Sequence, residues 1–389
     1  MKLLHISNKP VFPLVDGGCV AMAALLKGLT EISDDVFHCY IHTPKHPADR
    51  ELYPSGTNFA LADNATFINT RLSAAGAVSS FLKGRNYNLS RFFSETFSEA
   101  LKNWLVTEKP DVIILESAFL LPYLAAIRSV SAAKVILRAH NVEHRLWQQQ
   151  AVQGEFPKKA YLAHLARTLK REELKGLQAV DQVWTITPED AADLRHLGIK
   201  TPIYTIPFAM ETAGPLPDYS NADFFHLGAL NWEPNKLAVN RLLMSIWPQF
   251  SLKSQSRLHI AGSFSDDFKM DFVPHVQIHG FAENAEAFML DHGSLVVPVI
   301  SGSGVRIKLL EAMALGIPCI STPLGAAGIL NASGQLKLAD SDEEWLAALG
   351  EFADSEAVRR SYGEKGKAYI EKYHSFAAVN AQMTTALGK

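Results

Sequence analysis

The chain has 389 residues, of which 48% are hydrophobic and 20% are charged, and its formal net charge is -3. This is the composition of an ordinary globular protein, and the near-neutral charge gives no case for nucleic-acid binding. The length suggests two domains. The cysteines, Cys19, Cys39 and Cys319, are odd in number and have no metal-ligand spacing, so we expect a reduced, cytosolic protein.

The N-terminal half follows the rhythm of an α/β domain. Residues 2–7 predict a first buried strand, because the apolar run is too short for a signal-peptide core. Gly17 and Gly18 then precede a helix predicted at 19–29. This order is typical of a doubly wound domain with a phosphate site at the helix start, although a tight turn explains the glycine pair equally well. No stretch approaches the roughly 18 apolar residues of a transmembrane helix.

Further elements are expected along this half. The sequence predicts strands at 36–42, 112–115, 134–138, 181–186 and 203–206, strand-like pieces at 57–61 and 65–68, and helices at 93–109, 120–128, 156–178 and 189–197. Basic and aromatic residues alternate in 81–93, a mixture that suits contact with a membrane or a lipid-linked acceptor. A solvated loop and amphipathic helix is the alternative interpretation.

Polar residues gather at the ends of two predicted strands. Glu116 and Ser117 follow one strand, and the run RAHNVEH at 138–144 follows the next. Ligands bind at the carboxyl ends of parallel strands, and so many polar groups would be costly in a core. We therefore expect His140 to line a cleft, where it would contact a sugar hydroxyl or the reacting centre. A cluster of caps and turns is the alternative.

The α/β rhythm restarts after a Pro-rich linker at 211–222. Strands are predicted at 224–227, 257–261, 276–279, 294–299 and 319–321, and helices at 236–246, 283–290, 307–315, 343–352 and 355–373. The sequence thus predicts two Rossmann-like domains with doubly wound parallel sheets, facing each other across a ligand-binding cleft.

Residues 299–328 form the most informative stretch. A loop of Gly and Ser, at 301–304, opens a predicted helix and suits a phosphate, because helix N-termini attract anions. Arg306 and Lys308 lie where the helix dipole disfavours cations, so an anion on the same loop would explain them. Glu311 lies about one turn further on, placed to accept hydrogen bonds from hydroxyl groups. A strand–helix–strand unit with a tight turn is the alternative.

Together these motifs resemble the retaining GT-B glycosyltransferases of family 4 over essentially the full chain. The resemblance rests on the stretch at 301–328, the Gly17-Gly18 turn, His140 in RAHNVEH, GALNWEPN at 228–235 and His279-Gly280-Phe281. It implies an acceptor domain at 1–210, onto which 375–389 pack back, and a domain at 211–374 that binds the nucleotide-sugar donor.

The resemblance also assigns roles to residues. Glu311 matches the second glutamate of the E-x7-E pair, which binds the donor ribose, whereas Ser303 stands where the first glutamate is expected. The loop around Gly302, Ser303 and Gly304 would bind the diphosphate together with Gly17 and Gly18, and Gly280 and Phe281 would meet the base. Ala229 and Pro234 replace basic residues that many members carry, and we expect Arg306 and Lys308 to supply that charge. Lys236 is the alternative.

The implied function is sugar transfer from an NDP-sugar to a glycan or lipid-linked saccharide, with retained configuration. His140, Arg306 and Lys308 would be the catalytic residues. No DxD motif follows a strand, so neither a metal nor a cofactor is expected. The expected location is the cytoplasm, at the inner membrane face if 81–93 contact lipid. A nucleotide-sugar epimerase and a non-catalytic nucleotide-sugar binding protein stay open, the latter because of Ser303.

Overall fold

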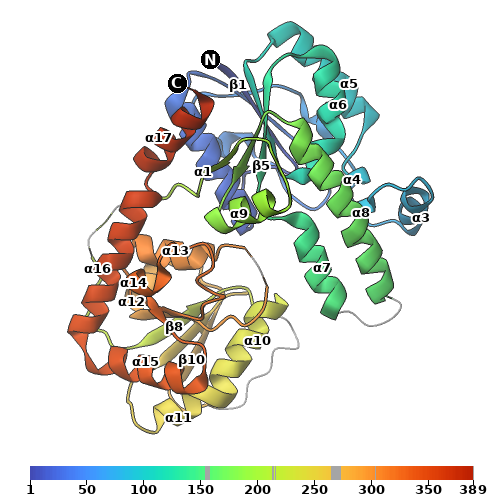
Figure 1. Cartoon of the computed structure of the whole chain (residues 1–389). Coiled ribbons are helices and arrows are strands. Elements are labelled where there is room, and N and C mark those ends of the chain that lie inside the picture. Colours follow the sequence, from blue (N-terminus) through green and yellow to red (C-terminus); the bar gives the residue numbers. More distant parts are fainter. Residues whose placement is uncertain (154–157, 213, 215, 264–272, 303, 389) are drawn as a thin grey trace. The chain divides into compact units, whose positions relative to one another are not determined.

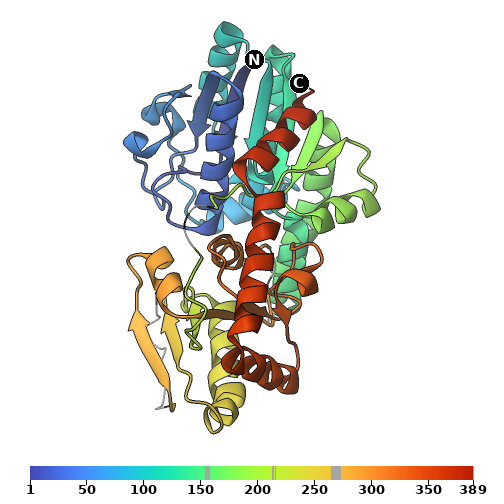
Figure 2. The same ribbon diagram turned by 90° about the vertical axis from the view of Figure 1, so that its left-hand side faces the viewer.

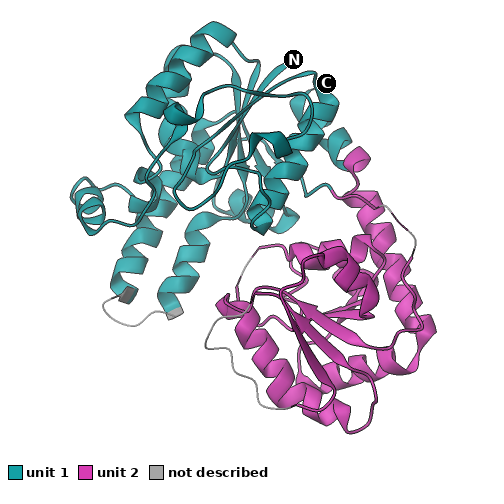
Figure 3. Ribbon diagram, turned by 180° about the vertical axis from the view of Figure 1, so that it is seen from behind, with its two compact units in different colours: residues 1–209, 379–389 teal, residues 210–378 magenta. Residues whose placement is uncertain are grey.

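The computed structural model describes residues 1–153, 158–212, 214, 216–263, 273–302 and 304–388 (Figure 1). The chain divides into two compact units, coloured separately in Figure 3. Unit 1 consists of residues 1–209 and 379–389, and unit 2 consists of residues 210–378.

Unit 1 is built on a parallel sheet with the strand order β3-β2-β1-β4-β5-β6-β7. Its strands are β1 (Lys2–Ser7), β2 (Asp35–Tyr40), β3 (Thr57–Phe59), β4 (Val112–Glu116), β5 (Lys134–Ala139), β6 (Gln182–Thr185) and β7 (Ile203–Thr205). Its helices are α1 (Gly17–Ile32), η1 (Arg50–Leu52), α2 (Asp63–Thr66), α3 (Ala74–Leu82), α4 (Tyr87–Ser90), α5 (Glu95–Glu108), η2 (Ala118–Tyr123), α6 (Leu124–Val130), α7 (Glu143–Gln153), α8 (Lys158–Ala179), α9 (Pro188–His196) and α17 (Phe376–Leu387). Helices lie against both faces of this sheet (Figure 2), which fits the burial of β4 and β5 along almost their whole length and the apolar residues at their centres.

Unit 2 repeats the architecture with the strand order β10-β9-β8-β11-β12-β13. Its strands are β8 (Phe224–Leu227), β9 (Leu258–Ala261), β10 (Val276–Gly280), β11 (Ser294–Val297), β12 (Cys319–Ser321) and β13 (Lys337–Leu338). Its helices are α10 (Glu233–Arg241), η3 (Leu242–Ile246), α11 (Trp247–Ser251), α12 (Ala285–Asp291), α13 (Ile307–Ala314), α14 (Ala332–Gln335), α15 (Asp342–Asp354) and α16 (Glu356–Tyr373). Trp247 and Trp345 are fully buried in its core. The predicted fold class, two Rossmann-like parallel-sheet domains, is therefore confirmed.

The strand order places a candidate ligand site in each unit. In unit 1 the order reverses between β1 and β4, and Ser7 pairs in register with Glu116 where those strands end. In unit 2 the order reverses between β8 and β11, which lead into Gly228 and the loop that precedes α13. Ligands of open α/β sheets bind beyond the carboxyl ends of the strands at such switch points.

Helix α17 completes unit 1 although it follows unit 2 in the chain. The backbone oxygen of Ala386 accepts hydrogen bonds from Lys134 Nζ at 3.3 Å and from Gln182 Nε2 at 2.7 Å. A Cβ atom at Gly28 would lie 2.6 Å from the side-chain oxygen of Asn380. The close approach of α17 to α1 therefore depends on a glycine.

The structure departs from the predicted elements where contacts between residues distant in the sequence determine the secondary structure. Residues 65–68, expected to be extended, overlap α2, and their strand character is limited to one bridge between His42 and Phe67. The helix expected at 236–246 begins at Glu233 and continues through the π-helical turn η3 into α11. Helix α7 was not expected. Its first backbone N–H groups bond to Glu173, which lies 30 residues along the chain.

No helix in the described part of the chain has both the length and the apolar character that crossing a membrane requires.

We predict that Gly363→Ala destabilises unit 2. A Cβ atom there would lie 2.2 Å from the backbone oxygen of Gly316 and 2.6 Å from the Tyr219 hydroxyl. A backbone oxygen cannot move aside unless the main chain moves with it. The free energy of unfolding should therefore fall by about 1–3 kcal/mol, as for other overpacked sites.

Gly350→Ala in the neighbouring helix α15 is the matched control, since nothing lies within 4 Å of its Cβ position. It should stabilise by about 0.5–1 kcal/mol through helix propensity alone. Urea unfolding measures both variants. Equal stabilisation by both would contradict the close packing of α16 on the turn at Gly316.

Candidate functional site

In unit 1 the polar residues at the strand ends converge on Glu116, the last residue of β4. Its side chain is fully buried. One carboxylate oxygen accepts hydrogen bonds from His5 Nε2 at 3.0 Å and from Arg138 Nη1 at 3.1 Å. The other oxygen pairs with His140 Nε2. Arg138 also donates to the backbone oxygen of Ala21 in α1, so the cluster joins three strands and a helix.

The charges of this cluster fix its protonation. Burial alone would raise the pKa of Glu116, but Arg138, His140 and His5 outweigh it and hold that pKa well below its ordinary value. Burial, followed by repulsion from His5, lowers the pKa of His38 well below the ordinary value. The His38 Nδ1 atom lies 2.9 Å from His5 Nδ1, and His5 Nε2 contacts the carboxylate, so the two rings extend the cluster inward from Glu116.

His140 is the member of this cluster that reaches the surface, with 17% of its side chain exposed. Since Nε2–H donates to Glu116, the Nδ1 atom of a neutral His140 carries a lone pair. An imidazole held in one orientation by a buried carboxylate suits contact with a hydroxyl group or a reacting centre.

The polar run at 138–144 divides between two sites. Arg138 and His140 belong to the Glu116 cluster, whereas Glu143 and His144 form hydrogen bonds with Glu173 of α8. The Glu173 carboxylate accepts from both backbone N–H groups at 2.9 and 3.0 Å and contacts His144 Nδ1 at 2.7 Å. Burial and Glu173 together raise the pKa of Glu143 to about 8. The second half of the run is thus the buried start of a helix.

The helix start at Gly17 and Gly18 is already capped by the chain itself. The Asp16 carboxylate accepts from Cys19 N at 2.9 Å and pairs with Lys9 at 2.5 Å. A Cβ atom at Gly18 would lie 3.2 Å from that carboxylate. An aspartate therefore occupies the position that we expected for a phosphate, and a phosphate role for the glycine pair stays a prediction.

In unit 2, glycines end three neighbouring strands. Gly228 follows β8, Gly262 follows β9, and Gly280 ends β10. Gly262 has a φ of +145°, and a Cβ atom there would lie 1.8 Å from the backbone oxygen of Gly228, so no other residue fits. Gly280 also has positive φ, and its backbone oxygen accepts from Gly262 N at 2.8 Å. These strand ends present backbone rather than side chains, which suits close approach of a ligand.

The Gly/Ser loop leads into α13. Gly302 and Gly304 both have positive φ, +93° and +81°, which an L side chain adopts only with strain. Ser303, the residue at the expected glutamate position, lies outside the described residues. Helix α13 begins at Ile307 without a side-chain cap, so a ligand rather than a neighbouring side chain is free to take the cap position.

Lys308 points its ammonium at the end of β8. Its Nζ atom lies 3.3 Å from His226 Nε2 and 3.4 Å from Asn235 Oδ1. His226 is buried and donates from Nδ1 to the backbone oxygen of Val296 at 2.9 Å, so Nε2 is the acceptor for the lysine. A Cβ atom at Gly228 would lie 2.9 Å from Nζ. Glycine at 228 therefore makes room for the ammonium.

Arg306 folds back onto the Gly/Ser loop that precedes it. Its guanidinium donates to the backbone oxygens of Gly304 at 3.1 Å and Ser301 at 3.4 Å. A Cβ atom at Gly302 would lie 3.4 Å from both Arg306 Nη2 and Pro234 Cγ. The two cations are close enough that burial, followed by Arg306, lowers the pKa of Lys308 to about 7. Burial likewise lowers the pKa of Arg306.

The remaining predicted donor residues lie on the same unit. Glu311 is half-buried one turn into α13, and burial raises the pKa of its carboxyl. Phe281 follows Gly280 with 74% of its surface exposed, and Trp232 in the turn after β8 is 58% exposed. The structure thus brings Gly302, Gly304, Arg306, Lys308 and Glu311 together around one loop and helix start.

Sequence reasoning missed the groups that hold these residues in place. Glu116 was noted at a strand end but given no role. His226, which contacts Lys308, is not marked by the sequence, and Asn235 is marked only as the last residue of the turn at 228–235. A signal existed for Glu116, since an acidic residue ending a buried parallel strand is unusual in a core. No comparable signal marks His226, which lies inside an apolar strand.

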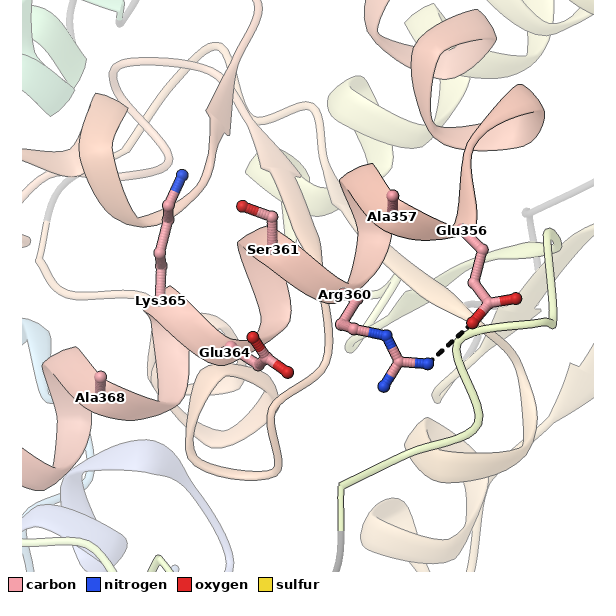
Figure 4. A pocket seen from close by; sticks show the side chains of 7 residues that line it. All are labelled: Glu356, Ala357, Arg360, Ser361, Glu364, Lys365 and Ala368. Carbon is pink, nitrogen blue, oxygen red and sulfur yellow. Dashed lines mark hydrogen bonds and ion pairs between the residues drawn. The ribbon is translucent and has the colours of Figure 1, made fainter.

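A shallow hollow of about 640 Å³ lies elsewhere, along α16 (Figure 4). All of its lining residues come from that one helix, and Arg360 is bonded to Glu356 at 2.7 Å, four residues earlier. This is an ordinary surface ion pair, and we assign it no ligand.

Two family models match the chain. Residues 37–213 match Glycosyltransferase Family 4, and residues 221–354 match Glycosyl transferases group 1. Each unit thus carries a glycosyltransferase domain. A search of curated proteins gave no match.

Solved structures share the fold over the whole chain. Sucrose-phosphate synthase from Thermosynechococcus elongatus has a TM-score of 0.71 at 16% identity, covering 100% of this chain and 98% of its own. HepE from Anabaena, in complex with UDP, has a TM-score of 0.68 at 11% identity, covering 100% and 99%. The UDP-forming α,α-trehalose-phosphate synthase from Burkholderia xenovorans, in complex with glucose-6-phosphate, has a TM-score of 0.61 at 11% identity, covering 100% of both chains.

We predict that Lys308→Met stabilises the ligand-free protein and flattens its pH dependence. A lysine in the unfolded chain keeps its proton to about pH 10.4, whereas Lys308 in the folded chain loses it near pH 7. Between these values the unfolded state binds more protons, so the free energy of unfolding of the wild type rises with pH. Well below pH 7 Lys308 is charged in both states, and the wild type carries the full cost of removing its ammonium from water.

Urea unfolding at several pH values between 6 and 9 measures the effect. The exposed Lys253→Met is the matched control and should change neither stability nor its pH dependence. If Lys308→Met were less stable than the wild type at pH 7, the conclusion that the charge of Lys308 destabilises the folded protein would be wrong.

Proposed function

We propose that this chain, a glycosyltransferase of GT-B type, moves a sugar from a nucleoside diphosphate sugar to a hydroxyl group with retained configuration. The observation that carries the proposal is the pair of partly buried cations, Arg306 and Lys308, at the glycine strand ends of unit 2. A diphosphate placed there would offset their mutual repulsion and, as it departs from the sugar, would gain stabilisation from both.

The position of these cations supports an exchange of charges within the donor site. The resemblance leads us to expect basic residues in the turn at 228–236, where this chain has Ala229 and Pro234. Arg306 and Pro234 both lie against Gly302, and Lys308 reaches Asn235 in that same turn. We propose that the two cations supply from α13 the charge that the turn itself does not carry.

The other donor contacts follow from the same loop and helix. Glu311 is proposed to accept hydrogen bonds from the ribose hydroxyls, and the backbone at Gly280 with the exposed ring of Phe281 is proposed to meet the base. Ser303 is proposed to contact the donor sugar. With two cations for the leaving group, the reaction is proposed to need neither a metal nor another cofactor.

His140 is proposed to act at the reacting sugar. Its Nε2–H is held by Glu116, so its Nδ1 would accept a hydrogen bond from a sugar hydroxyl. Glu116, kept ionised by Arg138, orients the ring and does not touch the substrate. The acceptor is proposed to be a glycan or lipid-linked saccharide, held mainly by unit 1.

We predict that Arg306→Ala and His140→Ala separate donor binding from chemistry. UDP is the first probe, because HepE was solved in complex with UDP. Arg306→Ala should weaken UDP binding by at least about tenfold, which is the worth of one charge-assisted hydrogen bond. His140→Ala should bind UDP as the wild type does, yet lose about a hundredfold in turnover.

Calorimetry measures the binding, and release of UDP from a panel of UDP-sugars measures turnover with and without acceptor. Lys253→Ala and His196→Ala are exposed controls on units 2 and 1. Unchanged UDP binding in both Arg306→Ala and Lys308→Ala would contradict the proposed diphosphate site. Binding without any turnover would favour the non-catalytic binding protein, and a free isomerised sugar would favour the epimerase.

A second proposal concerns the contact of residues 81–93 with a membrane. Leu72, Val78, Phe81 and Leu82 on and before α3 are 57–79% exposed, and Lys83 and Arg85 beside them are exposed as well. Exposed apolar side chains next to basic ones suit an interface with anionic lipid. A cavity of about 860 Å³ adjoins them in unit 1, and its basic lining residues are Arg85, Arg128, Arg171 and Lys175. We propose that a lipid-linked acceptor is taken up there.

We predict that the double variant Phe81→Glu with Leu82→Glu binds vesicles of phosphatidylglycerol and phosphatidylcholine at least about tenfold more weakly, since it loses two apolar side chains and gains repulsion. Vesicle sedimentation measures the change. Val106→Glu, on an apolar position of α5 that is 53% exposed, is the control. Equal sedimentation of all three proteins would contradict the membrane contact.

A further inference from the structure

Three histidines meet on unit 2 although they lie far apart in the sequence. His259 is on β9, His279 is on β10, and His292 caps the end of α12. One ring nitrogen from each lies within 4.8 Å of the other two. The ring centroids of His259 and His292 are 4.3 Å apart, and those of His279 and His292 are 4.9 Å apart. Three imidazoles from three elements therefore share one small space.

The outer nitrogens of two of these rings are already engaged in the manner of metal ligands. His259 Nε2 donates to the Asp223 carboxylate at 3.3 Å. His292 Nδ1 donates to the backbone oxygen of Phe288 at 2.6 Å. A histidine that binds a metal almost always donates its other N–H to a carboxylate or a backbone carbonyl, because this fixes the ring and its tautomer. These bonds leave His259 Nδ1 and His292 Nε2 as lone-pair atoms.

The third ring completes the set by a change of tautomer. His279 Nε2 lies 2.9 Å from His259 Nδ1, and because that atom carries a lone pair, His279 donates to it. Moving this proton to Nδ1 of the exposed His279 ring turns Nε2 into a third ligand. Burial, together with the neighbouring imidazoles, holds the pKa of His259 at about 4, and burial followed by His292 lowers that of His279.

We propose that His259, His279 and His292 bind one zinc ion, with Asp223 and the Phe288 carbonyl orienting the rings. Neutral imidazole is a preferred ligand of Zn²⁺, and three histidines leave a fourth position for water. Tetrahedral zinc with bonds of about 2.0–2.1 Å needs ligand nitrogens about 3.4 Å apart, and the three rings already bring nitrogens within 4.8 Å of one another.

The site has a mechanical consequence for the edge of the sheet. Strand β10 is the outermost strand, bonded to β9 alone within the described residues. A zinc ion would join β10 both to β9 and to the end of α12. It would thereby hold the backbone that leads into Gly280 and Phe281. This role is structural, and the zinc site stands whether or not unit 2 binds a nucleotide.

The test uses the tag-free full chain, because a histidine tag binds the same metals. After dialysis against chelator, one equivalent of Zn²⁺ should bind and raise the Tm, since an ion that binds only the folded state stabilises it. Co²⁺ should give the visible absorption bands of a tetrahedral complex. The amides of β10 should exchange more slowly with the ion than without it.

His279→Ala and His292→Ala should each weaken Zn²⁺ binding by at least about tenfold, and Asp223→Asn should do so through the outer contact. The exposed His196→Ala in unit 1 should bind zinc as the wild type does. The proposal would be overturned if the wild type did not bind Zn²⁺. It would also be overturned if His279→Ala and His292→Ala both bound Zn²⁺ as tightly as the wild type. UDP binding measured on the same samples tests the proposed function separately.

Discussion

Both units of this chain are constrained by parallel strands whose carboxyl ends all lie at one edge of a sheet. Helices cover the two faces of each sheet. Polar side chains and backbone groups can therefore contact a ligand at this edge without being buried in the apolar core. In unit 1 the reversal of strand order places Glu116 there with Arg138 and His140. In unit 2 it places Gly228 there, facing Lys308. The same topology therefore produces a charge-balanced cluster around a carboxylate in one unit and a cationic cluster in the other.

The two clusters differ in how their charge is balanced. Glu116 is fully buried, yet Arg138 and two histidines compensate it, and its pKa is low. Lys308 is instead contacted by a neutral histidine and an amide, with a second cation nearby, and its pKa is lowered to about 7. A compensated charge stabilises the folded chain and orients a ring. The uncompensated charge of Lys308 destabilises the ligand-free protein, and an anionic ligand would relieve that cost.

Much of the fold could be predicted because its signals are local. Apolar strands, glycine turns and capping residues repeat along the sequence, and the helix start at 307 with its two cations needs no distant partner to be recognised. The start of α7 could not be predicted, because Glu173 caps it from another helix. The orienting role of Glu116 and the meeting of His259 with His279 and His292 depend on strand register and on helix packing. Single residues spaced 20 and 13 positions apart carry no pattern that reveals such a meeting.

The position of α17 has a consequence for synthesis of the chain on the ribosome. Unit 1 consists of residues 1–209 and 379–389, whereas unit 2 is one continuous segment. At about 5–20 residues per second, roughly ten to thirty seconds separate the emergence of the two parts of unit 1. During that interval Asn380 does not yet pack against Gly28 of α1. Lys134 and Gln182 do not yet have the carbonyl of Ala386 as a hydrogen-bond acceptor. The first unit to be translated is therefore the last to be finished.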